Sequence, residues 1–222
     1  MDNLDFSPLW QFRDALMKGL LISLELSVIC AVLGTAFGFF IAIGRQSHIR
    51  PLRAVMGLYV EVLRGTPVLV TLFWVFFCLP IILRFELGTF ESSVIAMTLY
   101  MAAVTSESFR SALKSVSQDQ FDACNALGLG PLVQSVYVIA PQALIRAIPN
   151  LLSNTVSLFK ESALVSAVGL VELMFTAQNI ATSTERPVEV LTATALIYFV
   201  IGFGLTRIVN RVEARILSRV GA

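Results

Sequence analysis

Three pairs of charged residues lie within otherwise apolar stretches of the chain, and they are the first candidates for chemistry. The pairs are Glu61 with Arg64, Glu107 with Arg110, and Lys160 with Glu161. An ionisable side chain at the centre of a bilayer costs at least about 2.5–3.5 kcal/mol, so it requires an ionic partner, water or a polar ligand. Because both signs occur together, these positions suit the binding of a small charged solute.

The spacing within each pair leaves two interpretations open. Glu107 and Arg110 are three residues apart, as are Glu61 and Arg64, so each pair can close on one helix face as a purely structural contact. Lys160 and Glu161 are adjacent and point about 100° apart around a helix, so at least one of them needs a partner elsewhere. We expect Glu107, Arg110, Lys160, Glu161 and the neighbouring Ser162 to line a solute pathway, with inter-helix ion pairs as the alternative.

No motif for bond-making chemistry accompanies these charges. The chain contains no GxxxxGK[ST], GxSxG or HExxH pattern, and its single histidine, His48, lies in an arginine-rich segment where we expect it to be solvated. The three cysteines have no CxxC spacing, which argues against a metal site or a disulfide framework and favours small buried hydrophobic residues. They are Cys30, Cys78 and Cys124. The sequence therefore predicts neither an enzyme nor a metalloprotein.

Composition indicates that lipid surrounds most of the chain. Of its 222 residues, 56% are hydrophobic and 14% charged, against about 25% charged residues in a soluble domain. The net charge of +1 argues against a nucleic-acid partner. Residues 1–14 are acidic and aromatic and lack the features of a cleaved signal peptide, so we expect the first apolar segment to be retained as a membrane span.

The apolar segments predict an all-α membrane protein with five transmembrane helices, since a helix needs about 20 apolar residues to cross a bilayer. The third segment is charge-free over residues 92–106 only, so its helix has to carry Glu107 into the membrane, with or without Arg110. In the second, Gly65, Thr66 and Pro67 follow Arg64 and predict a helix break that serves as a hinge or gate. The expected spans are residues 19–44, 59–83, 92–110, 147–171 and 190–206.

The positions of small residues and of arginines predict how the spans pack and how they are oriented. Gly34, Gly38 and Ala42 are four apart and predict a face for close helix packing on the first span. Arginine and lysine predominate after the first, third and fifth spans, which predicts an outside N-terminus and a cytoplasmic C-terminus. Four arginines at every fourth position end the chain, and we interpret them as an anchor on acidic headgroups. They are Arg207, Arg211, Arg215 and Arg219.

The loop between the third and fourth spans, about residues 115–134, predicts a short cytoplasmic helix. Ser117 and Gln120 fit a capping box at its start, and glycines at 128 and 130 end it. Pro131 suits the first position of the next helix. We expect Phe121, Cys124 and Leu127 to share one face. A soluble partner docking on this helix explains it, and a helix resting on lipid is the alternative.

This loop resembles the EAA loop of ABC importer permeases, whose pattern is EAA, three residues, Gly, nine residues and Ile-x-Leu-Pro. The matching residues are Asp122, Ala123, Cys124, Gly128 and Pro141. Three further segments are similar to the polar-amino-acid branch of that family. They are RGTPVLV at 64–70, AVTSESFR at 103–110 and FKESAL at 159–164, and PQALIRAIP at 141–149 resembles the same branch's PQAxRxxxP.

The resemblance implies a single transmembrane domain over residues 1–222 with the type-1 importer fold, acting in the bacterial inner membrane. It implies a permease subunit of an ATP-driven importer for polar amino acids. Asp122, Leu127 and Gly128 would couple it to cytoplasmic ATPase subunits. Two ATPase subunits, a second permease subunit and an external binding protein would be partners. ATP would bind to the partners, and the chain itself would hold no cofactor.

Three other functions remain alternatives at this stage. One is a permease of another small-solute importer branch, such as methionine, which the RGTP and FKESAL segments disfavour. A second is an ATP-independent secondary carrier, which would be expected to show internal repeats, and none is seen between the two halves. A third is a scaffold subunit without a pathway, for which intramembrane charges would be unexpected. The transported amino acid, and whether the permease pairs with itself or a paralogue, stay open.

Overall fold

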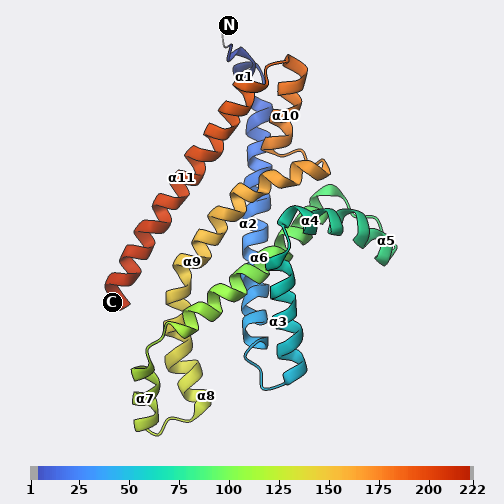
Figure 1. Ribbon diagram of the computed structural model, residues 1–222. Helices are drawn as coiled ribbons and strands as arrows, with labels where there is room; N and C mark the ends of the chain where they lie inside the picture. Colours follow the sequence, from blue (N-terminus) through green and yellow to red (C-terminus); the bar gives the residue numbers. More distant parts are fainter. Residues whose placement is uncertain (1–4, 221–222) are drawn as a thin grey trace.

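The computed structural model describes residues 5–220, with side chains through Ile216, and every element in that part is helical. A short α1 (Ser7–Gln11) leads into α2 (Arg13–Gly44), which packs against α6 (Thr89–Lys114). The last helix, α11 (Pro187–Val220), runs along one side from the α10 end and stops short of α7 and α8 (Figure 1). The N-terminus and the α10–α11 connection lie at one end, and α7 and α8 lie at the other.

The all-helical fold is confirmed. The described part of the chain contains three or four helices that meet the criteria for a membrane span, whereas five spans were expected. Within the described part, three helical segments are long and apolar enough to cross a membrane by themselves. They are Arg13–Gly44, Pro131–Val168 and Pro187–Ile216. A bent pair of helices, Arg50–Gly65 and Val68–Leu83, raises the number to four if it counts as one span. α6 is not among these segments: besides Glu107 and Arg110 it carries Glu91 and several Ser and Thr residues.

The second expected span is not one continuous helix. α3 (Arg50–Gly65) begins nine residues earlier than the predicted 59, and the chain then turns by 109° at Thr66 and Pro67. The extended backbone of Thr66 and the missing N–H of Pro67 end α3, so the predicted break is confirmed. Beyond it, α4 (Val68–Phe73), a π-helical turn (Trp74–Cys78) and α5 (Leu79–Leu83) project sideways from the bundle (Figure 1).

The fourth expected span, residues 147–171, is also interrupted. α9 (Ala140–Glu161) ends at the charged pair, a 3₁₀ segment (Ser162–Val168) follows, and α10 (Leu173–Thr184) continues in a new direction. Glu172 is fully buried at this junction and caps α10 by accepting from the Phe175 N–H at 2.8 Å. It also accepts from Ser23 Oγ of α2 at 2.9 Å and from the Tyr198 hydroxyl of α11 at 2.8 Å. One carboxylate therefore joins three helices next to the break.

The small-residue face on α2 is confirmed as the contact with α6. A Cβ added at Gly34 would lie 2.5 Å from the Met101 Cβ, and one at Gly38 would overlap the Thr105 hydroxyl. Thr105 donates to the Gly34 carbonyl at 3.0 Å, a contact that requires backbones in close approach. Cys30 and Cys124 are buried, as expected of small hydrophobic residues, whereas Cys78 is only half-buried. His48 is exposed in the α2–α3 connection.

Candidate functional site

Arg64 of α3 and both members of the α6 pair, Glu107 and Arg110, meet in one cluster. Glu107 of α6 is surrounded by three guanidinium groups from three helices. Arg45, which follows α2, places Nη1 2.9 Å from Glu107 Oε2, and Arg64 of α3 places Nη1 3.8 Å from the same oxygen. Arg110 places Nε 2.9 Å from both carboxylate oxygens. Within this cluster of four side chains, three positive charges surround a single negative one.

The predicted pairing of Glu107 with Arg110 is confirmed, and the pairing of Glu61 with Arg64 is wrong. Arg64 lies in the last turn of α3, just before the chain turns, and it is directed toward Glu107 instead. Among the described residues, Glu61 makes no ion pair and is exposed. The prediction failed because α3 packs against α6, which brings Arg64 within reach of Glu107, and the spacing within α3 does not reveal this contact.

Glu161 is the last residue of α9 and contacts α6. The Tyr100 hydroxyl of α6 donates to Glu161 Oε1 at 3.3 Å. The other oxygen, Oε2, is buried and has no protein partner. Tyr100 precedes Glu107 by seven residues, which is two helical turns, so both side chains project from the same face of α6. An unpartnered buried carboxylate oxygen is costly and favours a site that a cationic group can fill.

Lys160 and Ser162 do not join Glu161. Lys160 is exposed and its alkyl stem packs beside α11, 3.8 Å from where a Cβ on Gly202 would lie. Ser162 is fully buried and donates to the Phe159 carbonyl at 2.7 Å. The divergence of Lys160 from Glu161 follows the expected 100° between adjacent helical residues. The structure thus brings Glu161 together with α6 and places the other two residues elsewhere.

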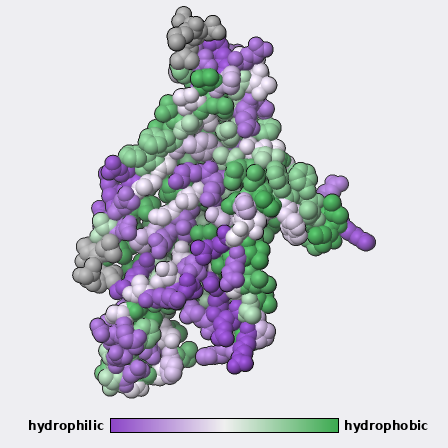
Figure 2. Space-filling model, viewed as in Figure 1, coloured by the Kyte–Doolittle hydropathy of each residue, from purple (hydrophilic) through white to green (hydrophobic). Residues whose placement is uncertain are grey.

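A polar stripe on α9 is a feature that the sequence interpretation missed. Asn150, Ser153 and Ser157 are exposed along one side of α9, and half-buried Asn154 donates to Ser108 Oγ of α6 at 2.9 Å. Their spacing of three and four residues is visible in the sequence, but their lack of charge concealed them. Figure 2 shows hydrophilic residues across the middle of the face in view, over α3, α6 and α9.

The loop helix forms the second part of the site. α7 (Gln118–Ala126) begins after Ser117, as predicted, but the Ser117 side chain makes no capping bond, and Gln118 Nε2 instead donates to Asp122 Oδ1 at 3.2 Å. The helix ends in a Schellman motif: the Gly128 N–H bonds to the Asn125 carbonyl and the Leu129 N–H to the Cys124 carbonyl. Gly128 has φ +68°, which explains the glycine there.

Only part of the predicted apolar face of α7 points inward. Cys124 is buried and Phe121 half-buried against the α9 side, whereas Leu127 is 76% exposed. Six residues advance a helix by 600°, so Leu127 and Phe121 lie 120° apart and the prediction of one shared face is wrong. Asp122 and Ala123 are also exposed. This end of the molecule presents a carboxylate among apolar groups.

Contacts with α9 and the segment before it hold α7 in place. Gln142 donates to Gln120 Oε1 at 3.1 Å, and Arg146 donates to the Ser115 carbonyl at 2.5 Å. Gln142 and Arg146 belong to the PQALIRAIP segment, whose sequence does not reveal these partners. Pro141 is exposed in the first turn of α9. The turn α8 (Pro131–Val133) and a π-helical segment (Gln134–Ile139) complete the loop, and Leu132 and Tyr137 are each 76% exposed.

The arrangement suits solute binding and mechanical coupling. In the described part of the chain, no three His, Cys, Asp or Glu side chains are grouped so as to hold a metal ion. Polar groups of both signs line one side of the bundle, and α9 connects them directly to the exposed α7 end.

Comparison with known proteins agrees with this arrangement. Residues 34–218 match the family described as "Binding-protein-dependent transport system inner membrane component". The chain is 33% identical to the "Arginine transport system permease protein ArtQ" of Bacillus subtilis over 218 residues, covering 97% of this chain and 99% of the relative. It is also 33% identical to the "L-cystine transport system permease protein TcyB" of the same organism, covering 92% and 88% of the two chains.

Solved structures show the same likeness. A chain of an "amino acid ABC transporter with histidines" superposes with a TM-score of 0.92 at 30% identity, covering 96% of this chain and 99% of that one. An inward-facing "MetNI methionine ABC transporter" chain gives a TM-score of 0.71 at 20% identity, covering 91% and 98%. At that lower identity the second likeness concerns the fold alone.

Proposed function

The chain belongs to the family of binding-protein-dependent transport system inner membrane components, and on that premise we propose that it is the permease subunit of an ATP-driven bacterial importer for polar amino acids. The observation that carries the proposal is the likeness, over nearly the whole chain, to a solved amino acid ABC transporter. The protein works in the inner membrane as a multi-pass subunit, and its relatives are permeases rather than catalytic subunits.

Topology and partners extend this proposal. The charge-bearing α6 is the fifth span beside the four that apolar composition supports, with the N-terminus outside and the C-terminus in the cytoplasm. Two ATPase subunits, which bind the ATP, dock at α7 around Asp122 and Leu127. A second permease subunit, identical or paralogous, covers the polar side of the bundle. An external binding protein delivers the amino acid.

The pathway begins with Glu161 and ends at the arginine cluster. Glu161 offers its unpartnered oxygen to the ammonium group or a cationic side chain of the solute. Arg64 is 49% exposed and only loosely held at 3.8 Å from Glu107, so it is available to the solute carboxylate. Tyr100 lies within electrostatic range of both groups. The break at Gly65, Thr66 and Pro67 directly follows Arg64 and lets α3 move relative to α4.

Reconstitution tests the proposed function. Proteoliposomes containing the chain with its ATPase partner are expected to take up a polar amino acid only when ATP and the binding protein are supplied. Liposomes without the ATPase are the control and are expected to show no uptake. Equal uptake without ATPase would identify an ATP-independent carrier, and methionine as the only solute would identify the other importer branch.

A further inference from the structure

Three hydrogen bonds connect α6, together with the residue that caps its end, to α9 at regular intervals along both helices. They link Ser115 to Arg146, Ser108 to Asn154 and Tyr100 to Glu161. The bonded residues are 31, 46 and 61 positions apart in the chain, so each step adds 15 positions. Because α6 runs toward α7 and α9 returns from α8 (Figure 1), this constant step indicates two antiparallel helices in one register, bonded at every second turn.

The apolar part of the α6–α9 contact does not define this register by itself. Phe109 and Ala112 of α6 pack with Ala147 and Leu151 of α9 in one cluster. Hydrophobic contact is non-directional, so such a surface loses little when one helix slips by a turn. A side-chain hydrogen bond is lost by the same slip, just as a single buried asparagine specifies the register of a coiled coil. The polar contacts therefore define how α9 is aligned on α6.

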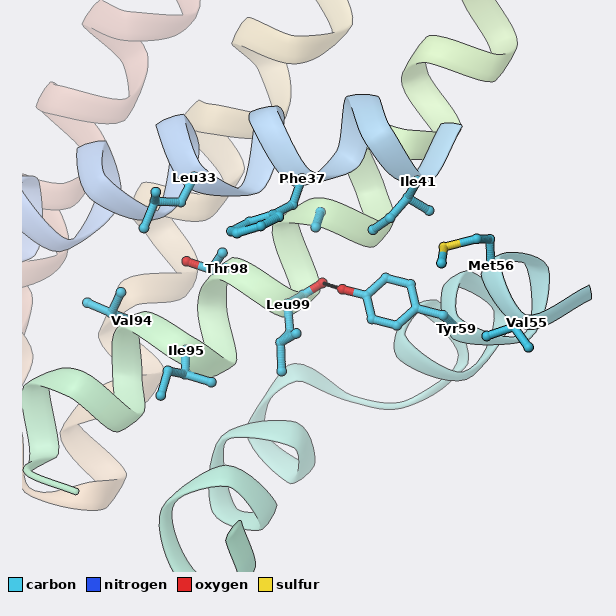
Figure 3. Close-up of a pocket in the computed structure, with 11 residues that line it drawn as sticks. Leu33, Phe37, Ile41, Val55, Met56, Tyr59, Val94, Ile95, Thr98 and Leu99 are labelled. Atoms are coloured by element: carbon cyan, nitrogen blue, oxygen red, sulfur yellow. Dashed lines mark hydrogen bonds between the residues drawn. The ribbon is translucent and has the colours of Figure 1, made fainter. Parts of the chain in front are cut away.

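Of the two helices, α6 is the one that other elements hold in place. Its contact with α2 leaves no room for a Cβ at Gly34 or Gly38. The Tyr59 hydroxyl of α3 donates to the Leu99 carbonyl at 2.7 Å, beside an apolar pocket between α2, α3 and α6 (Figure 3). Leu99 directly precedes Tyr100, so α2 and α3 fix α6 at the level where Glu161 meets it.

A proline divides α9 between the first and second of these contacts. Pro149 lies inside α9 and has no N–H, so the helical hydrogen bond to the Ile145 carbonyl is missing. Arg146 precedes this weak point, whereas Asn154 and Glu161 follow it. The Arg146 contact therefore aligns the part of α9 beside α7. The Asn154 contact aligns the part that carries Glu161, which lies two turns further along the same side of the helix.

We propose that Asn154 is a positioning residue for solute binding: its bond to Ser108 sets the register of residues 150–161 on α6 and thereby holds Glu161 at Tyr100. The bond is well matched, because the Ser108 hydroxyl donates its own proton to the Val104 carbonyl at 3.3 Å and is free to accept from Asn154. Asn154 acts through Glu161 and needs no contact with the solute. This inference rests on the proposed function, in which Glu161 binds the amino acid.

Uptake kinetics of the complete transporter in proteoliposomes test this role. Asn154→Leu removes the donor and is expected to raise the half-saturation concentration about threefold or more, the effect of an average hydrogen bond between membrane helices, with little change in the maximal rate. Ser108→Ala should do the same, and the double variant should be no worse, since both changes remove one contact. Thr155→Val is the matched control, because the Thr155 hydroxyl bonds within α9 to the Leu151 carbonyl. Additive losses, or an unchanged half-saturation concentration in Asn154→Leu, would overturn the proposal.

Disulfide cross-linking reports the register without any transport. In a transporter whose native cysteines are replaced by alanine, the pair Val104→Cys with Ser157→Cys lies between the second and third contacts and is expected to cross-link. The pair Val104→Cys with Ser153→Cys, one turn out of register, is expected to react less. Adding Asn154→Leu should lower the ratio of the two yields about threefold or more, and adding Thr155→Val should not. An unchanged ratio in Asn154→Leu would overturn the positioning role, whereas a wild-type transporter without ATP-driven uptake would contradict the proposed function instead.

Discussion

At the scale of single residues, the two membrane carboxylates are distinguished by their partners. Both oxygens of Glu107 are occupied by guanidinium groups from three helices, so this residue acts as an anchor among α2, α3 and α6. Glu161 has one oxygen bound to Tyr100 and the other without a protein partner. We therefore assign the solute-binding role to Glu161 and the structural role to Glu107.

This distinction predicts different losses in two isosteric variants. Glu161→Gln is expected to raise the half-saturation concentration for uptake about tenfold or more, because a hydrogen bond to a charged group contributes about 1.5–3 kcal/mol. The thermal stability of this variant should change little. Glu107→Gln is expected to lower stability by about 1–3 kcal/mol, since three arginines then share no negative charge. Thermal unfolding in detergent and initial uptake rates measure the two effects.

The reverse pattern would refute the assignment. If Glu107→Gln stays stable and loses only affinity for the amino acid, the solute binds at the arginine cluster. If both variants transport normally at wild-type expression, both acids are structural.

At the scale of elements, the close contact between α2 and α6 depends on glycines, whose lack of a side chain lets the two helices approach. Gly38→Ala places a Cβ 2.8 Å from the Ala102 carbonyl and over the Thr105 hydroxyl, so the helices have to separate. We expect a loss of about 1–3 kcal/mol in stability, as for other overpacked contacts. Gly204→Ala on α11 is the control: no atom lies within 4 Å of its added Cβ, and its stability should be unchanged or slightly higher. Thermal denaturation of both purified variants checks this.

The α7 element transmits force only if its exposed surface meets a partner. Asp122→Lys reverses a charge at the centre of that surface, so uptake is expected to fall at least tenfold while the ATPase subunits still hydrolyse ATP. Parallel assays of ATP hydrolysis and uptake in proteoliposomes measure the coupling. Glu213→Lys is the control, because Glu213 is also an exposed acid but belongs to α11 and not to α7. Full uptake in Asp122→Lys would exclude this docking surface.

At the scale of the whole molecule, the sequence predicted helix breaks and close-packing positions, but it did not predict which residues far apart in the chain form contacts. Gly128, Pro67 and the small residues of α2 act through their own backbone or size, so their roles follow from the sequence. Arg45 and Glu107 are 62 residues apart, and nothing in either segment indicates their contact. The 109° turn after α3 is similar: Pro67 predicts a break, but the packing of α4 against α6 sets its direction.

The arrangement of the chain ends also constrains how the protein sits in the membrane. Arg186, in the α10–α11 connection, lies 3.4 Å from Asp5, so the N-terminal segment and that connection share one end of the molecule. The α2–α3 connection and α7 lie toward the opposite end (Figure 1). Arg207, Arg211 and Arg215 lie along the second half of α11, directed away from the Asp5 end, and the side chain of Arg219 is outside the described residues.

Reporter fusions test the proposed orientation of these two ends. Alkaline phosphatase, which folds only outside the cytoplasm, is expected to be active when inserted after Glu185 and inactive after Ser47 or Asn125. A fluorescent protein fused to the C-terminus is expected to fluoresce, because α11 carries it into the cytoplasm. The reason is the excess of arginine at the Ser47 end, which resists translocation. Active phosphatase after Ser47 would show that the orientation is the opposite of the proposed one. In that orientation α7 would lie outside the cytoplasm, where no cytoplasmic ATPase could reach it.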